Sequence, residues 1–167
     1  MTEAAATRVY PQRPWVGVGA VVLHQGQVLL VRRGRPPGRG MWAFPGGVVR
    51  LGESVLAAAR RELLEETGLD ARPVDVVDVY EYIERDDTGR VRYHYVIVEV
   101  LLTPTGPTEV HAADDAAAAA WFPIAALQRP DVGPGVPRVV ARALARLGPH
   151  PGEPASASPA AGSSGGK

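Results

Sequence analysis

The sequence predicts an α+β fold, and three features of the chain support this prediction. Strand-like segments lie both before and after one strongly helical segment at 55–67, and a second helical segment follows at 137–147. A central helix between strands, with another helix at the end, is compatible with a mixed sheet lying between helices. The 167 residues suffice for one domain with additional segments at its ends.

Before the central helix, short apolar runs alternate with turns that contain glycine or proline, which is the pattern of strands joined by hairpins and loops. The first run is rich in Val and Gly and favours a buried strand. The expected elements are a strand at 15–23, a turn at 24–27, a strand at 28–32, a loop at 34–40 and an extended segment at 42–49.

The central helix has recognisable ends and one apolar face. Glu53 and Ser54 stand where the helix would begin, and an acidic residue is favoured in a first turn. Gly68 follows the helical segment as a C-terminal stop. One face of the helical projection is apolar and predicts the side that packs on the core, namely Leu56, Ala59 and Leu63.

After the central helix the pattern predicts a long hairpin, a loop and a final helix. The expected elements are a strand at 74–83, a turn at 86–89, a strand at 91–102, a loop at 103–115 and a helix at 137–147. Segment 116–122 is ambiguous, because its alanines favour helix whereas its Trp-Phe-Pro end resembles the end of a strand. The apolar stripe expected on the final helix comprises Val139, Val140, Ala143, Leu144 and Leu147.

Composition sets the domain limits and excludes several classes of protein. The formal net charge is zero, so no overall field favours a nucleic acid polymer or a membrane surface as partner. The absence of cysteine excludes disulfides, thiol catalysis and Cys-type zinc sites. Without an apolar signal core or a run long enough to span a bilayer, we expect a cytoplasmic location. We predict a flexible lead-in at 1–13, the domain at 14–148 and a disordered tail at 149–167.

Residues 47–69 hold the most informative pattern of the chain. Glu62, Glu65 and Glu66 share an arc roughly 100° wide on the helix, where clustered carboxylates repel one another unless cations neutralise them. Hard divalent ions such as Mg²⁺ or Mn²⁺ would do so, whereas a solvated acidic face paired with Arg60 and Arg61 is the alternative. The fixed positions of the pattern are Gly47, Glu53, Arg61, Glu62, Glu65, Glu66, Gly68 and Leu69.

This pattern fills every fixed position of the Nudix box, so the chain resembles hydrolases that cleave a diphosphate linked to another group. The resemblance implies an α/β/α sandwich with a mixed central sheet, and Mg²⁺ or Mn²⁺ as cofactor. It implies that Glu62, Glu65, Glu66 and the backbone carbonyl of Gly46 bind the metal. Arg61 is expected mainly to organise these carboxylates.

The general base and the role of Arg50 are open at this point. Relatives take the base either from the box or from a loop before a late Trp-containing strand, which points here to Glu65 or to Asp115, with Glu109 behind it. Asp115 has a second interpretation as the N-cap of a helix, because an alanine run follows it. Arg50 occupies a position where relatives often have glutamate, and it would either contact phosphate or lie in solvent.

Substrate recognition is expected from residues just before the box. Arginine suits phosphate oxygens through its planar fork, and Trp42 could stack on a base, whereas Phe44 fits the core better. The hairpin residues Tyr80, Tyr82, Tyr93 and His94 would line either a pocket or a dimer interface. The predicted phosphate-binding arginines are Arg32, Arg33 and Arg35, with Arg39 in the same loop.

A second resemblance, over residues 15–147, is to the bacterial group labelled ADP-ribose pyrophosphatase. It implies a nucleoside diphosphate-type small molecule as substrate, with ADP-ribose cleaved to AMP and ribose 5-phosphate as the leading hypothesis. A proline that marks ADP-ribose specificity in some relatives has no counterpart at 82–90. Nucleotide sugars, dinucleoside polyphosphates, NADH and oxidised nucleoside triphosphates remain alternatives, as does a non-catalytic nucleotide-sensing module. A homodimer is possible in either case.

Overall fold

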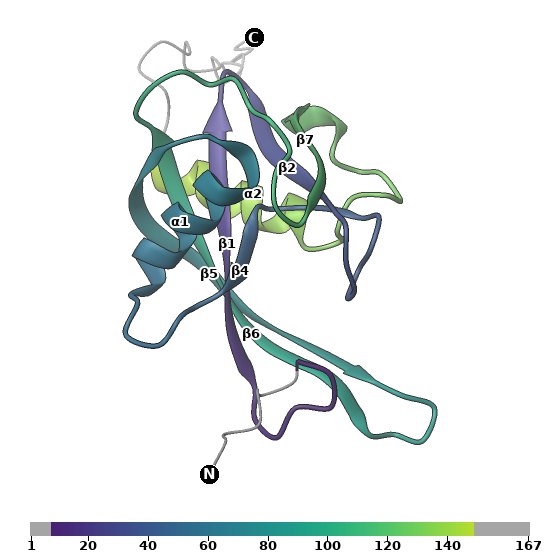
Figure 1. Ribbon diagram of the computed structural model, residues 1–167. Coiled ribbons are helices and arrows are strands. Elements are labelled where there is room, and N and C mark those ends of the chain that lie inside the picture. Colours follow the sequence, from purple (N-terminus) through teal and green to yellow (C-terminus); the bar gives the residue numbers. More distant parts are fainter. Residues whose placement is uncertain (1–7, 149–167) are drawn as a thin grey trace, which may run out of the picture.

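The computed structural model describes residues 8–148 of the chain (Figure 1). The predicted tail at 149–167 and the first seven residues of the predicted lead-in lie outside the described residues. Within the described part of the lead-in, Tyr10 contacts the domain: its backbone N–H donates to Arg92 and its hydroxyl donates to Asp86. In residues 8–148 no helix has the length and apolar character needed to cross a membrane.

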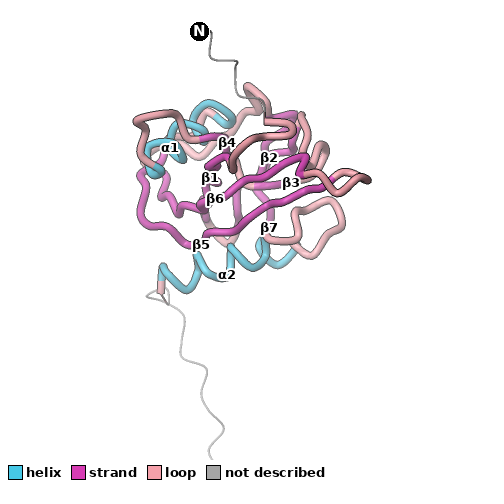
Figure 2. Tube along the Cα trace, turned by 90° about the horizontal axis from the view of Figure 1, so that it is seen from below, coloured by secondary structure: helices cyan, strands magenta, loops and turns pink. Residues whose placement is uncertain are grey.

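The described residues form a mixed seven-stranded sheet with one helix on each side, which confirms the α+β prediction (Figure 2). The strand order is β3-β2-β1-β6-β5, with β4 paired to β1 and β7 paired to β2. Only β1 and β6 run parallel, and the other pairs are antiparallel. The elements are β1 (Trp15–His24), β2 (Gln27–Arg33), β3 (Trp42–Ala43), β4 (Gly46–Val48), α1 (Val55–Thr67), β5 (Ala71–Arg85), β6 (Val91–Pro104), β7 (Ala116–Pro123), η1 (Ile124–Ala126) and α2 (Val136–Leu147).

Alternate residues of the strands supply two separate apolar cores, one under each helix. In β1, Val18, Ala20 and Val22 face α1, whereas Val21 faces α2. This follows from the two-residue period of a strand, which sends successive side chains to opposite faces of the sheet. The sheet therefore separates the side chains that pack on α1 from those that pack on α2.

The predicted apolar faces of both helices are correct only in part. Leu56 is 41% exposed, and Leu144 and Leu147 are 43% and 50% exposed, so these three residues do not belong to the buried cores. A helical projection shows to which side of the helix a side chain points, but not whether another element packs against it at that position along the helix axis. All three leucines lie in the first or last turn of their helix. The buried apolar residues of the helices are Ala58, Ala59 and Leu63 in α1 and Val136, Val139, Val140 and Ala143 in α2.

The ambiguous alanine segment is a strand. β7 pairs with β2 along its whole length, from Pro123 opposite Gln27 to Ala116 opposite Arg33. Backbone pairing with an existing strand here outweighs the helix propensity of alanine, which is only a weak preference. The helix N-cap interpretation of Asp115 is therefore wrong.

The helix ends follow the prediction. Ser54 has extended backbone angles, and its side chain accepts a hydrogen bond from the Ala57 N–H at 3.1 Å, as an N-cap residue should. Gly68 ends the helix in a left-handed conformation with φ of 72°, and this conformation favours glycine. These caps fix the start of α1 directly after the turn that follows β4.

Candidate active site

Strand β4, which precedes α1, approaches the carboxylates of the helix closely because it begins with two glycines. A Cβ atom on Gly47 would lie 2.3 Å from Glu62 Oε1, and a Cβ atom on Gly46 would lie 2.0 Å from the Val18 carbonyl oxygen. Any larger residue at either position would collide with these groups. The glycines therefore allow Glu62 to lie directly against the strand that precedes the helix.

Arg61 lies at the centre of the candidate site and uses every N–H of its guanidinium group. Nε and Nη2 donate to the two carboxylate oxygens of Glu53 at 2.6 and 2.8 Å. Nη1 donates to Glu62 at 2.6 Å and to Glu65 at 3.1 Å, and Nη2 also donates to the Val48 carbonyl at 3.2 Å. Five donors with five acceptors fix the position of the guanidinium and of the three carboxylates around it.

Glu53 and Arg50 extend this cluster toward solvent. Hydrogen bonds from Arg61 lower the pKa of Glu53 to about 2, and the Arg50 backbone N–H acts in the same direction. The Arg50 guanidinium lies 3.3 Å from Glu65 Oε1. Arg60, the neighbour of Arg61 in sequence, points elsewhere and pairs with Asp70 at 2.8 Å. Only one of the two adjacent arginines therefore belongs to the cluster.

Glu62 and Glu66 are the buried carboxylates of the cluster. Burial raises the pKa of Glu62, against the opposing effect of Arg61. Burial also raises the pKa of Glu66 to about 7, although the Gly46 N–H donates to its Oε2 at 2.9 Å. A nearby cation would stabilise the ionised form of such a buried carboxylate, because it offsets the loss of hydration.

The donor atoms of this cluster fit a hard divalent ion. Four carboxylates gather around one turn, and oxygen donors of this kind suit Mg²⁺ or Mn²⁺. Within residues 8–148, no three His, Asp or Glu side chains are already arranged as a metal-binding group. Arginine and backbone donors engage the carboxylates instead, so a metal ion would replace some of these contacts.

The loop before β7 is attached to the C-terminal end of α1. The backbone N–H groups of His111 and Ala113 donate to the Thr67 and Glu66 carbonyls, both at 2.9 Å. This attachment brings Asp114 close enough to raise the pKa of Glu66. Sequence spacing alone could not separate Asp114 from Asp115, because the direction of each side chain depends on how the loop folds back.

Asp115, the predicted loop base, is paired with one of the predicted phosphate-binding arginines. Its Oδ1 lies 2.9 Å from Arg35 Nη2, and the two side chains are 40% and 76% exposed, respectively. Its backbone carbonyl accepts a hydrogen bond from the Gly34 N–H at 3.2 Å. The structure thus brings the loop after β2 and the loop before β7 into contact with each other.

The other predicted substrate-binding residues lie on and after β2. Arg33 donates to the Pro37 carbonyl at 2.7 Å, and its charge lowers the pKa of Glu66. Arg32 is exposed and donates to the Gly40 carbonyl at 3.2 Å. Trp42 packs against the α2-side core and meets the Phe122 ring edge-on at 4.7 Å. Of the predicted phosphate-binding arginines, Arg33 is therefore the one whose charge acts on a carboxylate of the cluster.

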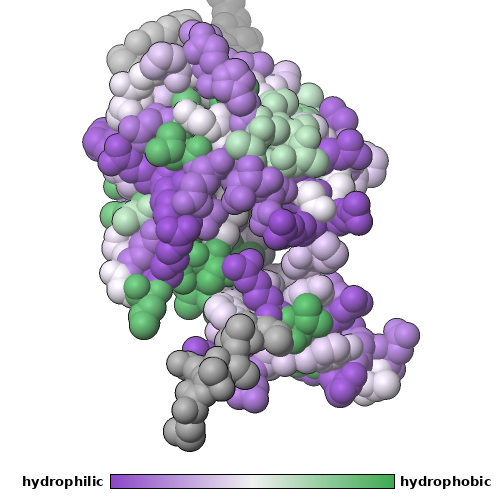
Figure 3. All heavy atoms as spheres, in the orientation of Figure 1, coloured by the Kyte–Doolittle hydropathy of each residue, from purple (hydrophilic) through white to green (hydrophobic). Residues whose placement is uncertain are grey.

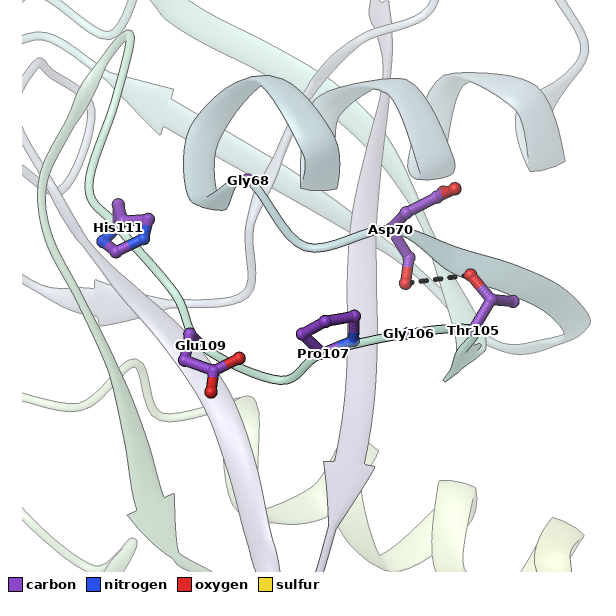
Figure 4. Close-up of a pocket in the computed structure, with 7 residues that line it drawn as sticks. All are labelled: Gly68, Asp70, Thr105, Gly106, Pro107, Glu109 and His111. Carbon is purple, nitrogen blue, oxygen red and sulfur yellow. Dashed lines mark hydrogen bonds between the residues drawn. The ribbon is translucent and has the colours of Figure 1, made fainter.

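Glu109 lies apart from the carboxylate cluster. It lines a cavity of about 480 Å³ at the C-terminal end of α1, together with Asp70 and His111 (Figure 4). Figure 3 shows that hydrophilic residues dominate the face of the molecule on which α1 lies, with hydrophobic patches among them.

The carboxylates of α1 lie against the glycines of β4, on one face of a mixed sheet with a helix on each side. The chain belongs to the NUDIX domain family, whose model matches residues 13–143. Members of this family generally use a divalent metal ion.

Two curated relatives illustrate this membership. An ADP-ribose pyrophosphatase of Methanocaldococcus jannaschii is 36% identical over 109 residues, which are 65% of this chain and 62% of the relative. Phosphatase NudJ of Escherichia coli is 34% identical over 95 residues, or 57% of this chain and 61% of the relative. The chain thus matches about three-fifths of the length of these curated relatives.

Among solved structures, a MutT NUDIX hydrolase of Burkholderia pseudomallei has the same fold. It superimposes with a TM-score of 0.67 at 28% identity, covering 80% of this chain and all of that one. This similarity confirms the predicted sandwich of a mixed sheet between two helices.

Proposed function

We propose that the protein is a Mg²⁺-dependent Nudix hydrolase that cleaves the pyrophosphate bond of a nucleoside diphosphate derivative, with ADP-ribose as the leading substrate. The observation behind this proposal is the group of four box glutamates held by Arg61 and by the Gly46 N–H. ADP-ribose is supported by the name of the Methanocaldococcus relative. Since the Escherichia coli relative is named only as a phosphatase, other diphosphate compounds belong in the same test.

Glu62, Glu65, Glu66 and the Gly46 carbonyl would hold the metal. When bound, the metal would neutralise phosphate oxygens and lower the pKa of a water molecule. Arg61 would keep Glu53, Glu62 and Glu65 in place, because its four hydrogen bonds to them leave them little freedom. The Gly46 N–H would do the same for Glu66. Arg33, beside the cluster, would bind a phosphate group.

The reaction consumes one water molecule. Its oxygen attacks one phosphorus of the P–O–P bridge, its proton passes to a carboxylate, and the bridging oxygen leaves with the other phosphate. With ADP-ribose the products are AMP and ribose 5-phosphate. Glu65 and Asp115 are the two candidates for the carboxylate that accepts the proton. Asp115 is paired with Arg35, whereas Glu65 is paired with both Arg50 and Arg61. Asp115 could act once Arg35 releases it, and Glu65 could act through Oε1 once Arg50 releases that oxygen.

A substrate panel tests the proposal. ADP-ribose, a nucleotide sugar, a dinucleoside polyphosphate, NADH and an oxidised nucleoside triphosphate are incubated with Mg²⁺, and phosphate is measured after phosphatase treatment. We expect the highest kcat/KM for ADP-ribose and no turnover after addition of a chelator. A much higher kcat/KM on another compound would overturn the substrate assignment.

Variants separate the two candidate bases from each other. Replacing Glu65 or Asp115 by its amide removes a candidate base but keeps the size of the side chain. The variant that lacks the true base should no longer show the acidic limb of the pH–rate profile, because that limb reports protonation of the base. The other variant should keep that limb. Tight nucleotide binding by the wild type without turnover of any compound would instead favour a non-catalytic sensing module.

A further inference from the structure

Arg50 lies beside the carboxylate cluster but outside the fixed positions of the box. Its backbone N–H donates to Glu53 Oε2 at 3.0 Å, and its carbonyl accepts from the Glu53 N–H at 3.0 Å. These two bonds hold its backbone at the turn before α1. Its side chain extends from there to Glu65 and is 65% exposed.

Two arginines share Glu65, and they differ in how firmly they are held. Arg61 contacts Oε2 and is only 17% exposed, with all five donors used. Arg50 contacts Oε1 through a single 3.3 Å pair at the surface. Exposed pairs of this kind contribute little to stability. Arg50 can therefore leave Glu65 at small cost, whereas Arg61 cannot.

The charges of the cluster suggest what would move Arg50. Four glutamates and two arginines give a formal charge of −2, which one divalent cation would neutralise. Glu65 is the most exposed of the carboxylates paired with Arg61, so a cation from solvent has direct access to it. A cation bound to Glu65 would repel the nearby guanidinium of Arg50.

We propose that Arg50 competes with the divalent cation for Glu65 and, once displaced, binds a phosphate group of the substrate. This proposal rests on the proposed function and assigns a role to a residue at a variable position of the box. The backbone of Arg50 stays anchored at Glu53 during this movement, so the guanidinium remains within reach of the site. Its planar fork matches two phosphate oxygens, which makes a diphosphate a suitable second partner.

Metal binding without nucleotide tests the first half of the proposal. Mn²⁺ is titrated into wild type, Arg50→Gln and Arg60→Gln, and free Mn²⁺ is followed by electron paramagnetic resonance. We expect Arg50→Gln to bind Mn²⁺ about two- to fivefold more tightly, because the competing pair is lost. Arg60→Gln removes an equally charged residue of α1 that pairs with Asp70, so it should match the wild type.

Steady-state kinetics on the best substrate of the panel, at saturating Mg²⁺, test the second half. Arg50→Gln should raise KM on the order of tenfold, as expected for a lost charged hydrogen bond, and leave kcat within about threefold. The KM of Arg50→Lys should fall between those of the wild type and Arg50→Gln, because lysine keeps the charge but lacks the planar fork. Tighter metal binding together with weaker substrate binding is a combination that a merely structural role would not produce.

The proposal is overturned if Arg50→Gln binds Mn²⁺ like Arg60→Gln, or if its KM equals that of the wild type. Circular dichroism and thermal unfolding establish that all variants are folded before these comparisons. Should the wild type cleave no compound of the panel, the proposed function fails. The Mn²⁺ titration would still decide whether Arg50 competes with a cation for Glu65.

Discussion

Two groups of carboxylates lie near opposite faces of the sheet and are neutralised in different ways. On the α1 side, Arg61 pairs with three glutamates and the Gly46 N–H holds a fourth, so the group keeps a formal charge of −2 when Arg50 is included. On the α2 side, Asp78 pairs with Arg138 and Arg142 of α2, and Glu99 lies beside it. Two acids and two arginines formally cancel there.

The difference shows that burial alone does not identify a functional carboxylate. Glu99 is 3% exposed, against 7% for Glu66, and burial raises the pKa of Glu99 further, to about 8. Glu66 nevertheless belongs to a cluster with excess negative charge near the surface, where a cation can enter. Asp78 is already bound to α2, so this second group mainly ties the helix to the sheet.

The largest expected effect is a difference in activity between variants of the two carboxylate groups. Glu66→Gln should lower kcat/KM about 10³-fold, because it removes a proposed metal ligand. Glu99→Gln should leave kcat/KM within about threefold. Both substitutions keep side-chain size, and steady-state assays on folded protein measure the outcome. Equal losses in the two variants would show that the α2-side group also takes part in the reaction.

A second comparison concerns the arginines. Arg61→Lys cannot satisfy Glu53, Glu62 and Glu65 together, so we expect about a 100-fold loss of kcat/KM and a destabilisation of about 2–4 kcal/mol. Arg60→Lys alters only an exposed pair with Asp70 and should change the free energy of unfolding by less than about 1 kcal/mol. Urea unfolding of both variants measures this. Similar stability losses would argue against a central role for Arg61.

The glycines offer a matched pair for the third comparison. An added Cβ would lie 2.3 Å from Glu62 at Gly47 and 1.9 Å from Glu99 Oε2 at Gly19. Each alanine variant should lose about 1–3 kcal/mol of stability through this overlap. Only Gly47→Ala should also lose activity, by about tenfold, because only it displaces a proposed metal ligand, Glu62. Thermal unfolding and kinetics decide, and an inactive Gly19→Ala that is still folded would contradict the expectation.

The smallest effect is a pH dependence of stability. The pKa of Glu99 in the folded protein, about 8, lies above its ordinary value of 4.5. Its favourable contribution is therefore complete below pH 4.5 and is lost as the pH rises through 8. Relative to Glu99→Gln, the wild type should lose on the order of 1–3 kcal/mol across this range. Urea unfolding of both proteins between pH 4.5 and 8.5 measures the difference, and parallel pH profiles would refute it.

Local sequence patterns predicted the parts of the fold that local physics controls. The caps at Ser54 and Gly68 and the hairpins follow from the conformational preferences of single residues and short turns. Segment 116–122 could not be assigned, because alanine has no strong preference and the deciding partner, β2, lies far away in sequence. The exposed Leu56 and Leu144 were misassigned because periodicity does not reveal where the neighbouring layer ends.

By itself, the sequence determined which residue types the proposed site contains. The grouping of Arg61 with the glutamates of α1 is a local property, since a helix places residues three and four apart on one side. Only the tertiary structure decided which charges meet. Arg61 turns to Glu53 while Arg60 turns to Asp70, and Arg50 reaches Glu65 across the turn. These contacts depend on how strand, turn and helix pack, because an ion pair forms only where folding brings its two groups together.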